Sequence, residues 1–204
     1  MKKTLLIVLF FFSINYIKAQ FAENNSMYAT TELIFGNIRG GVDLNLNYVH
    51  KNKYSLKIGY SGHIQIAEST PEDYSVGVAN FLFGGFGLIN HPYDQMHNYK
   101  LSAGRIYKLN EKGSLRVNLS GGLGYTIIRR PENWISNPNA LAENYSWNYK
   151  NLETLSLILN PKLELILKNW YGLTVSPLVI INPHNSYVGV GLGQMIGLLK
   201  KRDK

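Results

Sequence analysis

The sequence contains no cysteine among its 204 residues. This absence excludes a disulfide framework, a thiolate nucleophile, a cysteine-ligated metal and a lipid anchor on cysteine. Charged residues are also scarce, at 17% of the chain, and the basic ones form no stripe, so we expect no nucleic-acid partner. Glycine (19 residues) and tyrosine (14 residues) are abundant instead. This balance is typical of an all-β protein with tight turns.

The N-terminus has the features of an export signal. Lys2 and Lys3 precede an apolar run from Thr4 to Ile14, and Ala19 offers a small residue for cleavage. The run is too short for a membrane-spanning helix, which needs ~20 apolar residues, although a membrane anchor is the alternative. The pattern predicts a signal peptide over residues 1–19 and one domain over residues 20–204. Losing three lysines with the peptide would lower the net charge from +8 to +5.

Eight later segments alternate apolar and polar side chains with a period of two, as strands with two different surroundings do. The clearest is Tyr54–Ile66, which sets Leu56 and Ile58 against Lys57 and His63. The other seven predicted strands are Met27–Phe35, Gly41–His50, Tyr99–Leu109, Ser114–Ile128, Glu153–Leu167, Gly172–Asn182 and Tyr187–Leu199.

Two long intervals, 67–98 and 129–151, separate these strands and are predicted to be loops. In the first, Thr70 and Pro71 are typical of a helix start, which predicts a short helix from Thr70 to about Phe83. A further strand over Val76–Ile89 is the alternative for the same residues.

The connections alternate between short turns and longer loops, so all the short turns would lie at one end of a closed sheet. The polar faces are rich in Gly, Ser, Asn and Thr, which pack inside a narrow barrel, whereas the opposite faces are almost free of charge. We therefore predict an eight-stranded antiparallel up-and-down transmembrane β-barrel. A soluble lipocalin-like carrier barrel is the alternative, because it shows the same alternation with the faces exchanged.

The signal peptide, the eight strands and the loop asymmetry together resemble the small outer-membrane β-barrel proteins of Gram-negative bacteria, over residues 27–199. The resemblance is architectural. It implies an outer-membrane location, contact with outer-membrane lipid, long loops outside the cell and a structural or surface-binding role. One departure is the C-terminus, where Leu198 and Leu199 precede a charged tail while many such proteins end on an aromatic residue.

Several charged or titratable side chains fall on the polar faces, where we expect a paired network that fills the barrel, because unpaired buried charges are strongly penalised. A narrow pore is the alternative function for this interior. The predicted lumen network consists of Asp43, Lys57, His63, Arg116, Lys162 and Glu164.

Ser61 and His63 share a face of one strand, and a lipid-acting enzyme of the acyl hydrolase type is the alternative that they suggest. The surrounding sequence lacks the second glycine of a nucleophile elbow, so no catalytic residue is assigned. His91, Asp94 and His97 match no specific ligand spacing, and we expect neither a metal nor a cofactor.

The second long interval is the best candidate for binding an extracellular ligand, because aromatic side chains on a rigid scaffold suit recognition of sugars, peptides or lipid headgroups. The alternative is that these rings pack against the other long loop. The candidate residues are Trp134, Tyr145, Trp147 and Tyr149.

Overall fold

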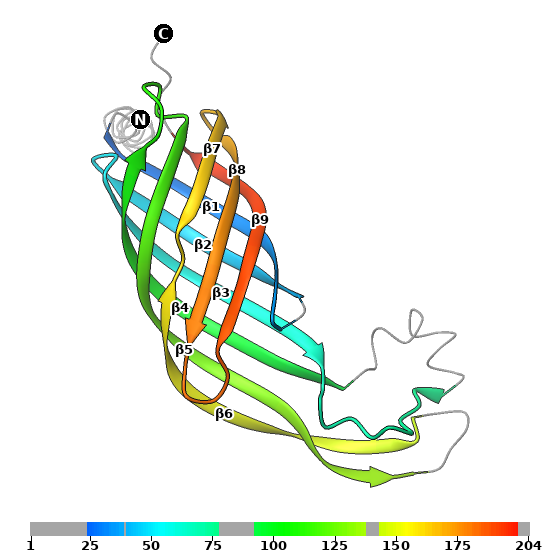
Figure 1. The fold of residues 1–204 in the computed structure, drawn as a ribbon. Coiled ribbons are helices and arrows are strands. Elements are labelled where there is room, and N and C mark those ends of the chain that lie inside the picture. The colour runs from blue at the N-terminus through cyan, green and yellow to red at the C-terminus, as the bar shows by residue number, and fades with distance from the viewer. Residues whose placement is uncertain (1–23, 39, 78–91, 138–142, 200–204) are drawn as a thin grey trace, which may run out of the picture.

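The computed structural model describes residues 24–38, 40–77, 92–137 and 143–199, and the predicted signal peptide lies outside these ranges. Nine strands form a single sheet in which every pair of neighbours is antiparallel (Figure 1). The strands are β1 (Ser26–Gly36), β2 (Gly40–His50), β3 (Tyr54–Ile66), β4 (Tyr93–Lys108), β5 (Leu115–Ser136), β6 (Tyr145–Leu159), β7 (Lys162–Lys168), β8 (Tyr171–Ile181) and β9 (Tyr187–Leu198).

The sheet closes on itself because β1 pairs with both β2 and β9, the last strand of the chain. The remaining strands pair in sequence order around the ring, and β6 and β7 both lie between β5 and β8. The barrel therefore has eight strand positions, and the prediction of an eight-stranded up-and-down barrel is confirmed.

The ninth strand arises from a break at Asn160 and Pro161 within the single strand predicted over Glu153–Leu167. The pairing register with β8 is the same on both sides of this break, which places Pro161 opposite Pro177. Proline has no backbone N–H, so neither residue can donate to the ladder. Asn160 repairs the gap, since its N–H donates to Ser120 O at 2.9 Å and its Nδ2 donates to Pro177 O at 3.1 Å.

The two faces of the sheet have opposite chemistry. On β3, Ile58 is 62% exposed on the barrel exterior while the neighbouring Lys57 is 2% exposed in the interior. The same alternation along the other strands gives an exterior of Leu, Ile and Val and an interior of Ser, Thr, Asn and charged residues. This distribution is the reverse of that in a soluble carrier barrel, whose apolar side chains face inward.

The long-loop prediction for residues 129–151 is wrong for most of its length. β5 continues to Ser136 and β6 begins at Tyr145, and the two pair throughout this extension. β4 likewise starts at Tyr93, six residues before its predicted start, so the first loop is also shorter than predicted. The alternation of apolar and polar side chains weakens in these stretches because neither face of the strands is uniformly apolar, although the backbone pairing persists.

The predicted helix from Thr70 is also wrong over the residues that the structure describes, because Thr70–Val76 contains only turns and irregular backbone. Thr70 Oγ1 donates back to Ala67 O at 2.7 Å instead of capping a following turn. The rest of the predicted helix, and the alternative strand beyond Gly77, lie outside the described residues. In the described parts of the chain, no helix has both the length and the apolar character needed to cross a membrane.

Both long connections, β3–β4 and β5–β6, lie at one end of the barrel together with the short β1–β2 and β8–β9 connections, and the opposite end carries only short turns (Figure 1). We call the end that carries the turns at 51–53, 109–114 and 169–170 the turn rim, and the opposite end the loop rim. The β2–β3 turn is tight because Lys51 and Asn52 adopt φ angles of 51° and 54°, as the twist of a hairpin favours. β1 begins and β9 ends at the turn rim.

Candidate functional site

The structure places all six residues of the predicted lumen network inside the barrel, each less than 5% exposed. Arg116 Nε donates to Glu164 Oε2 at 2.5 Å, and Tyr28 Oη donates to Glu164 Oε1 at 2.7 Å. The Arg116 guanidinium also lies 5.4 Å from the centroid of the Tyr28 ring. Glu164 is therefore held by a cation and a phenol at once, which offsets part of the cost of burying its charge.

Two further ion pairs use partners that the sequence analysis did not select. Lys162 Nζ lies 2.7 Å from Glu32 Oε1, and Lys100 pairs with Asp43. Glu32 also accepts hydrogen bonds from Thr174 at 2.6 Å and Ser176 at 2.5 Å. Alternation in the first and fourth predicted strands could have identified Glu32 and Lys100 as inward-facing. Glu32, for example, follows Tyr28 and Thr30 on the inward face of β1.

Lys57 differs from the other lumen cations because, among the described residues, it contacts no carboxylate. Its Nζ donates to Ser120 Oγ at 2.7 Å and lies 3.5 Å from both oxygens of Asn160. In the described part of the chain, the lumen thus holds four cationic side chains against three carboxylates. Neutral acceptors at the strand break stabilise Lys57. One of them is the backbone carbonyl of Asn160, which in a regular strand would accept a hydrogen bond from the neighbouring strand.

Apolar side chains close both ends of this charged layer. At the loop rim, Ile34, Met96 and Leu178 belong to one buried cluster, and at the turn rim Val49 and Met195 belong to another. An eight-stranded barrel is narrow enough for side chains to fill. In the described residues the polar layer is therefore sealed from both rims, which does not support the narrow-pore alternative.

Ser61 and His63 are both fully buried in the lumen, as inward-facing neighbours on β3. Ser61 Oγ and both ring nitrogens of His63 have no hydrogen-bond partner among the described residues. The His63 ring instead packs on the Tyr187 ring, with centroids 3.9 Å apart. Because Ser61 and His63 do not hydrogen-bond to each other, the geometry of an activated serine nucleophile is not formed.

Asp94 and His97 lie on β4, and His97 Nδ1 is 2.7 Å from Tyr60 Oη. Across the described residues, no three His, Cys, Asp or Glu side chains gather as a metal site would require. His91 lies outside those residues.

A two-stranded ribbon formed by the ends of β5 and β6, residues 130–136 and 145–150, projects from the loop rim (Figure 1). β4 pairs with β5 only as far as Arg129, and β8 pairs with β6 only from Leu157 onward. Beyond Arg129 and its partner Asn151, the described parts of the two strands have only each other as ladder partners. Seven residues of extended chain give the β5 arm a reach of roughly 20 Å.

Three of the four predicted binding residues meet on this ribbon. The centroids of the Trp134 and Trp147 rings are 5.3 Å apart, and those of Trp134 and Tyr145 are 6.2 Å apart. Trp134 joins its partners because of a bulge at Asn133 and Trp134, where the register shifts and Asn133 has a φ of 57°. A β-bulge redirects the side chains that follow it, and strict alternation would have placed Trp134 on the other face.

The segment after β3 packs onto the same three rings. Tyr74 lies 6.1 Å from Trp134 and 6.0 Å from Trp147, with both pairs edge to face. Tyr145 Oη donates to Asp73 Oδ1 at 2.9 Å, and this hydrogen bond raises the pKa of Tyr145. Partial burial in the cluster raises the pKa of Tyr74 to about 12. The rings therefore do pack against the other long loop.

All of these rings nevertheless stay half-buried, which leaves part of each surface available. We call Tyr74, Trp134, Tyr145 and Trp147 the aromatic cluster. Tyr149, the fourth predicted binding residue, forms no ring pair with these four residues within the described parts of the chain. The Arg129 guanidinium stacks 4.8 Å from the centroid of the Tyr149 ring.

Comparison with known proteins gives matches at the level of structure only. No protein-family model matches the chain, and no curated protein matches it in sequence. The N-terminal β-barrel domain of Pseudomonas aeruginosa OprF is similar in fold, with 13% identity, a TM-score of 0.50 and coverage of 86% of this chain and 98% of that domain. The fold is that of a small outer-membrane β-barrel.

Two other proteins with this barrel fold give lower scores. The Yersinia pestis attachment invasion locus protein Ail, solved with the heparin analogue sucrose octasulfate, matches with 12% identity, a TM-score of 0.48 and coverage of 86% of this chain and 98% of Ail. Neisserial surface protein A matches with 8% identity, a TM-score of 0.45 and coverage of 86% and 95%.

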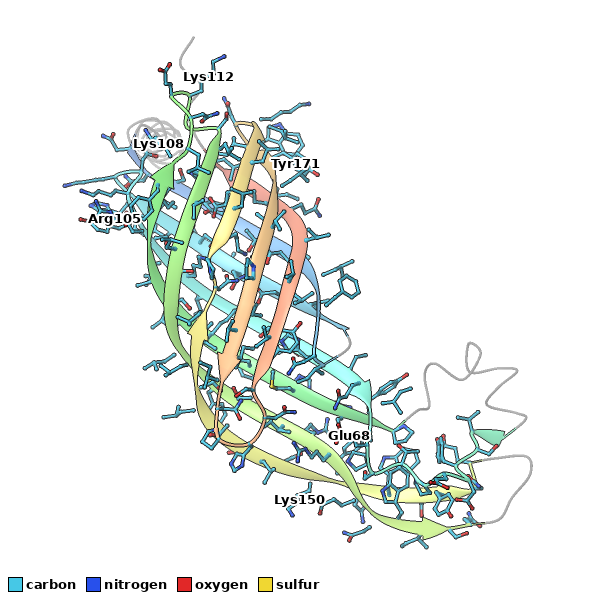
Figure 2. All side chains as sticks on the ribbon, viewed as in Figure 1. Glu68, Arg105, Lys108, Lys112, Lys150 and Tyr171 are labelled. Carbon is cyan, nitrogen blue, oxygen red and sulfur yellow. The ribbon has the colours of Figure 1, made fainter. Side chains whose placement is uncertain are left out.

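The loop rim of this barrel is acidic. Its described segments carry seven carboxylates and three cations, a formal charge of −4. Glu68 and Lys150 mark this end in Figure 2, and Lys150 is paired with Glu132 at 3.3 Å. The carboxylates are Glu68, Glu72, Asp73, Asp94, Glu132, Glu143 and Glu153, and the cations are Arg129, Arg130 and Lys150.

Proposed function

We propose that this protein is an outer-membrane β-barrel that binds an extracellular ligand through the aromatic cluster on its projecting ribbon. The membrane location is supported by the exterior belt of exposed Leu, Ile and Val, which includes Leu155 at 72% and Leu123 at 61% exposure. A contiguous apolar surface of this extent on a soluble protein would drive aggregation. Bilayer lipid is the partner that this belt fits.

The orientation follows from the loop asymmetry and from the proposed signal peptide over residues 1–19. Export through a cleaved peptide delivers a chain to the periplasm, and small barrels of this kind keep short turns on the periplasmic side. The turn rim would then face the periplasm and the ribbon would face the cell exterior. Export and cleavage are tested by the N-terminal sequence of the protein recovered from the outer membrane.

The observation that carries the binding role is the assembly of Trp134, Tyr145 and Trp147 on a ribbon that the barrel does not need for closure. Closure uses the β5 pairs up to Arg129 and the β8 pairs from Leu157. A ribbon beyond those points costs conformational entropy without adding to the wall, so it is better explained by a role at the cell surface.

The charge around the cluster narrows the ligand class. A rim with a formal charge of −4 repels polyanions and attracts cations. Exposed aromatic edges and faces bind cationic groups and the apolar faces of sugars. We therefore propose a neutral glycan or a basic peptide, and not a sulfated or phosphorylated polymer, as the ligand.

The chain itself provides a fluorescence assay, because it has only three tryptophans and two lie in the aromatic cluster. In detergent-folded protein with Trp170→Phe, all tryptophan emission reports on Trp134 and Trp147. Neutral glycans and basic peptides are titrated into this protein, and saturable quenching or a spectral shift is expected for one of the two classes.

The matched variants separate binding from a purely structural role. Trp134→Ala combined with Trp147→Ala should abolish binding measured by calorimetry, whereas Trp170→Ala at the opposite rim should leave it intact. Equal binding by both variants would overturn the proposed site. A mature chain that shows no heat-dependent gel shift after folding in detergent would overturn the membrane barrel itself.

A further inference from the structure

The turn rim carries a concentration of positive charge that the proposed function does not use. Its described segments hold six exposed cations and one carboxylate, Glu111, a formal charge of +5 that contrasts with −4 at the loop rim. Figure 2 shows Arg105, Lys108, Lys112 and Tyr171 at this end of the barrel. The six cations are Lys51, Lys53, Arg105, Lys108, Lys112 and Lys168.

Three of these cations are held beside exposed aromatic rings. Lys53 Nζ lies 5.5 Å from the Tyr54 ring, the Arg105 guanidinium 5.3 Å from the Tyr107 ring, and Lys168 Nζ 5.9 Å from the Trp170 ring. The rings are 51%, 44% and 55% exposed. Tyrosine and tryptophan at the edge of an apolar belt lie at the headgroup level of a bilayer.

The arrangement around the rim is the second observation. All three hairpins of the turn rim, β2–β3, β4–β5 and β7–β8, contribute at least one of these cation–aromatic pairs. The charges therefore form an arc around the barrel and do not converge on one point. A site for a single small anion needs donors that converge on one point. Lipids surround a barrel on every side, so cations spread along an arc can each meet a different lipid.

We propose that this arc binds the phosphate groups of anionic phospholipids in the leaflet on the turn-rim side. The inference rests on the proposed membrane location. Ammonium and guanidinium groups form charge-assisted hydrogen bonds with phosphate oxygens, and basic residues next to a membrane surface attract anionic lipid. The neighbouring rings hold the cations at the depth of the phosphates, so the pairing orients the barrel as well as attracting lipid.

The test uses the mature chain folded into vesicles of phosphatidylcholine mixed with phosphatidylglycerol. Spin-labelled forms of each lipid report which one is retained at the protein surface. We expect phosphatidylglycerol to be enriched roughly fivefold, the ratio that one basic residue near an anionic surface supplies. High salt should reduce the enrichment because it screens exposed charges.

Two charge-matched variants decide which rim is responsible. Lys53→Gln, Arg105→Gln and Lys168→Gln together remove three of the six turn-rim cations, the three held beside aromatic rings, and the enrichment should fall well below that of the unchanged chain. Arg129→Gln, Arg130→Gln and Lys150→Gln remove three cations from the loop rim, and the enrichment should persist. Equal loss in both variants, or no loss in either, would overturn the proposal.

The remaining outcomes also decide the question. If inorganic phosphate removes the enrichment while chloride of the same ionic strength does not, the arc is a free-phosphate site and the lipid proposal fails. If the turn-rim variant loses binding to purified cell-wall glycan but keeps its lipid selectivity, the partner is the glycan. A chain that does not insert into vesicles at all contradicts the membrane location, which is a separate failure.

Discussion

The charged lumen and the aromatic ribbon share strand β5 but are built by different physical rules. In the lumen, Arg116 and Glu164 face inward on paired strands, and the wall around them leaves little freedom. On the ribbon, Trp134 meets Trp147 only because a bulge changes the register. The positions of the lumen side chains are fixed by many strand pairings of the closed sheet. The arrangement of the ribbon side chains depends instead on one local backbone irregularity and on contacts with Tyr74.

This difference indicates where the molecule tolerates change. A lumen side chain cannot be removed without leaving a buried charge, so its loss should affect the whole barrel. The ribbon packs on one face only and its strands have no outer partners, so its changes should remain local. Stability and surface recognition are thus separated along β5 and β6.

The largest effect is expected for Glu164→Leu, which leaves Arg116 buried without its carboxylate. The free energy of unfolding should fall by about 3–5 kcal/mol, measured by urea unfolding of the micelle-folded protein. The double variant Arg116→Met with Glu164→Leu removes both charges and should recover a large part of that loss. If the double variant is as unstable as the single one, the cost comes from shape and not from the unpaired charge.

A smaller effect is expected when a lysine replaces an isoleucine on the lipid-facing wall, and the same change on the ribbon, at an isoleucine of nearly equal exposure, is the comparison. Ile58 is 62% exposed and Ile135 is 63% exposed. Ile58→Lys should destabilise the barrel by roughly 2–4 kcal/mol because it places a charge against lipid. Ile135→Lys should change the unfolding free energy by less than about 0.5 kcal/mol, because the ribbon end is solvated.

Unfolding in lipid vesicles, followed by gel mobility, measures both variants. Similar losses for the two would mean that the bilayer covers the ribbon as well, and the proposed boundary at the loop rim would be wrong.

The smallest effect concerns the bulge. Asn133 has a φ of 57°, in the left-handed region that Asn adopts more readily than other residues with a Cβ. Asn133→Ala should weaken the ribbon by at most about 1–2 kcal/mol, the cost of that backbone for an ordinary L-residue, and leave global unfolding unchanged, whereas Asn133→Gly should keep the bulge. Hydrogen exchange measures this local weakening when the rates of the ribbon amides are compared with those of the barrel amides. Faster exchange across the whole barrel would contradict the claim that ribbon and barrel stability are separate.

Strand positions were predicted well where one face meets an apolar surrounding and the other a polar interior. Tyr54–Ile66 matches β3 at both ends, because its alternation is unbroken. The prediction failed at 129–151, where both faces of the ribbon are mixed and alternation carries no information about pairing. It also missed that Pro161 splits a strand without changing its register, since that outcome depends on Asn160 reaching Ser120 and Pro177.

The sequence by itself determined the barrel, its eight strand positions and which side chains face inward, because a period of two is a local property of the chain. Only the tertiary structure decided the partners. Among the residues that the structure describes, Lys57 contacts no carboxylate although three lie in the same lumen, and Lys162 pairs with Glu32 at a sequence distance of 130 residues. Such pairings depend on the stagger of a closed sheet, and the meeting of Trp134 with Tyr74 depends on a bulge and a loop that no local pattern encodes.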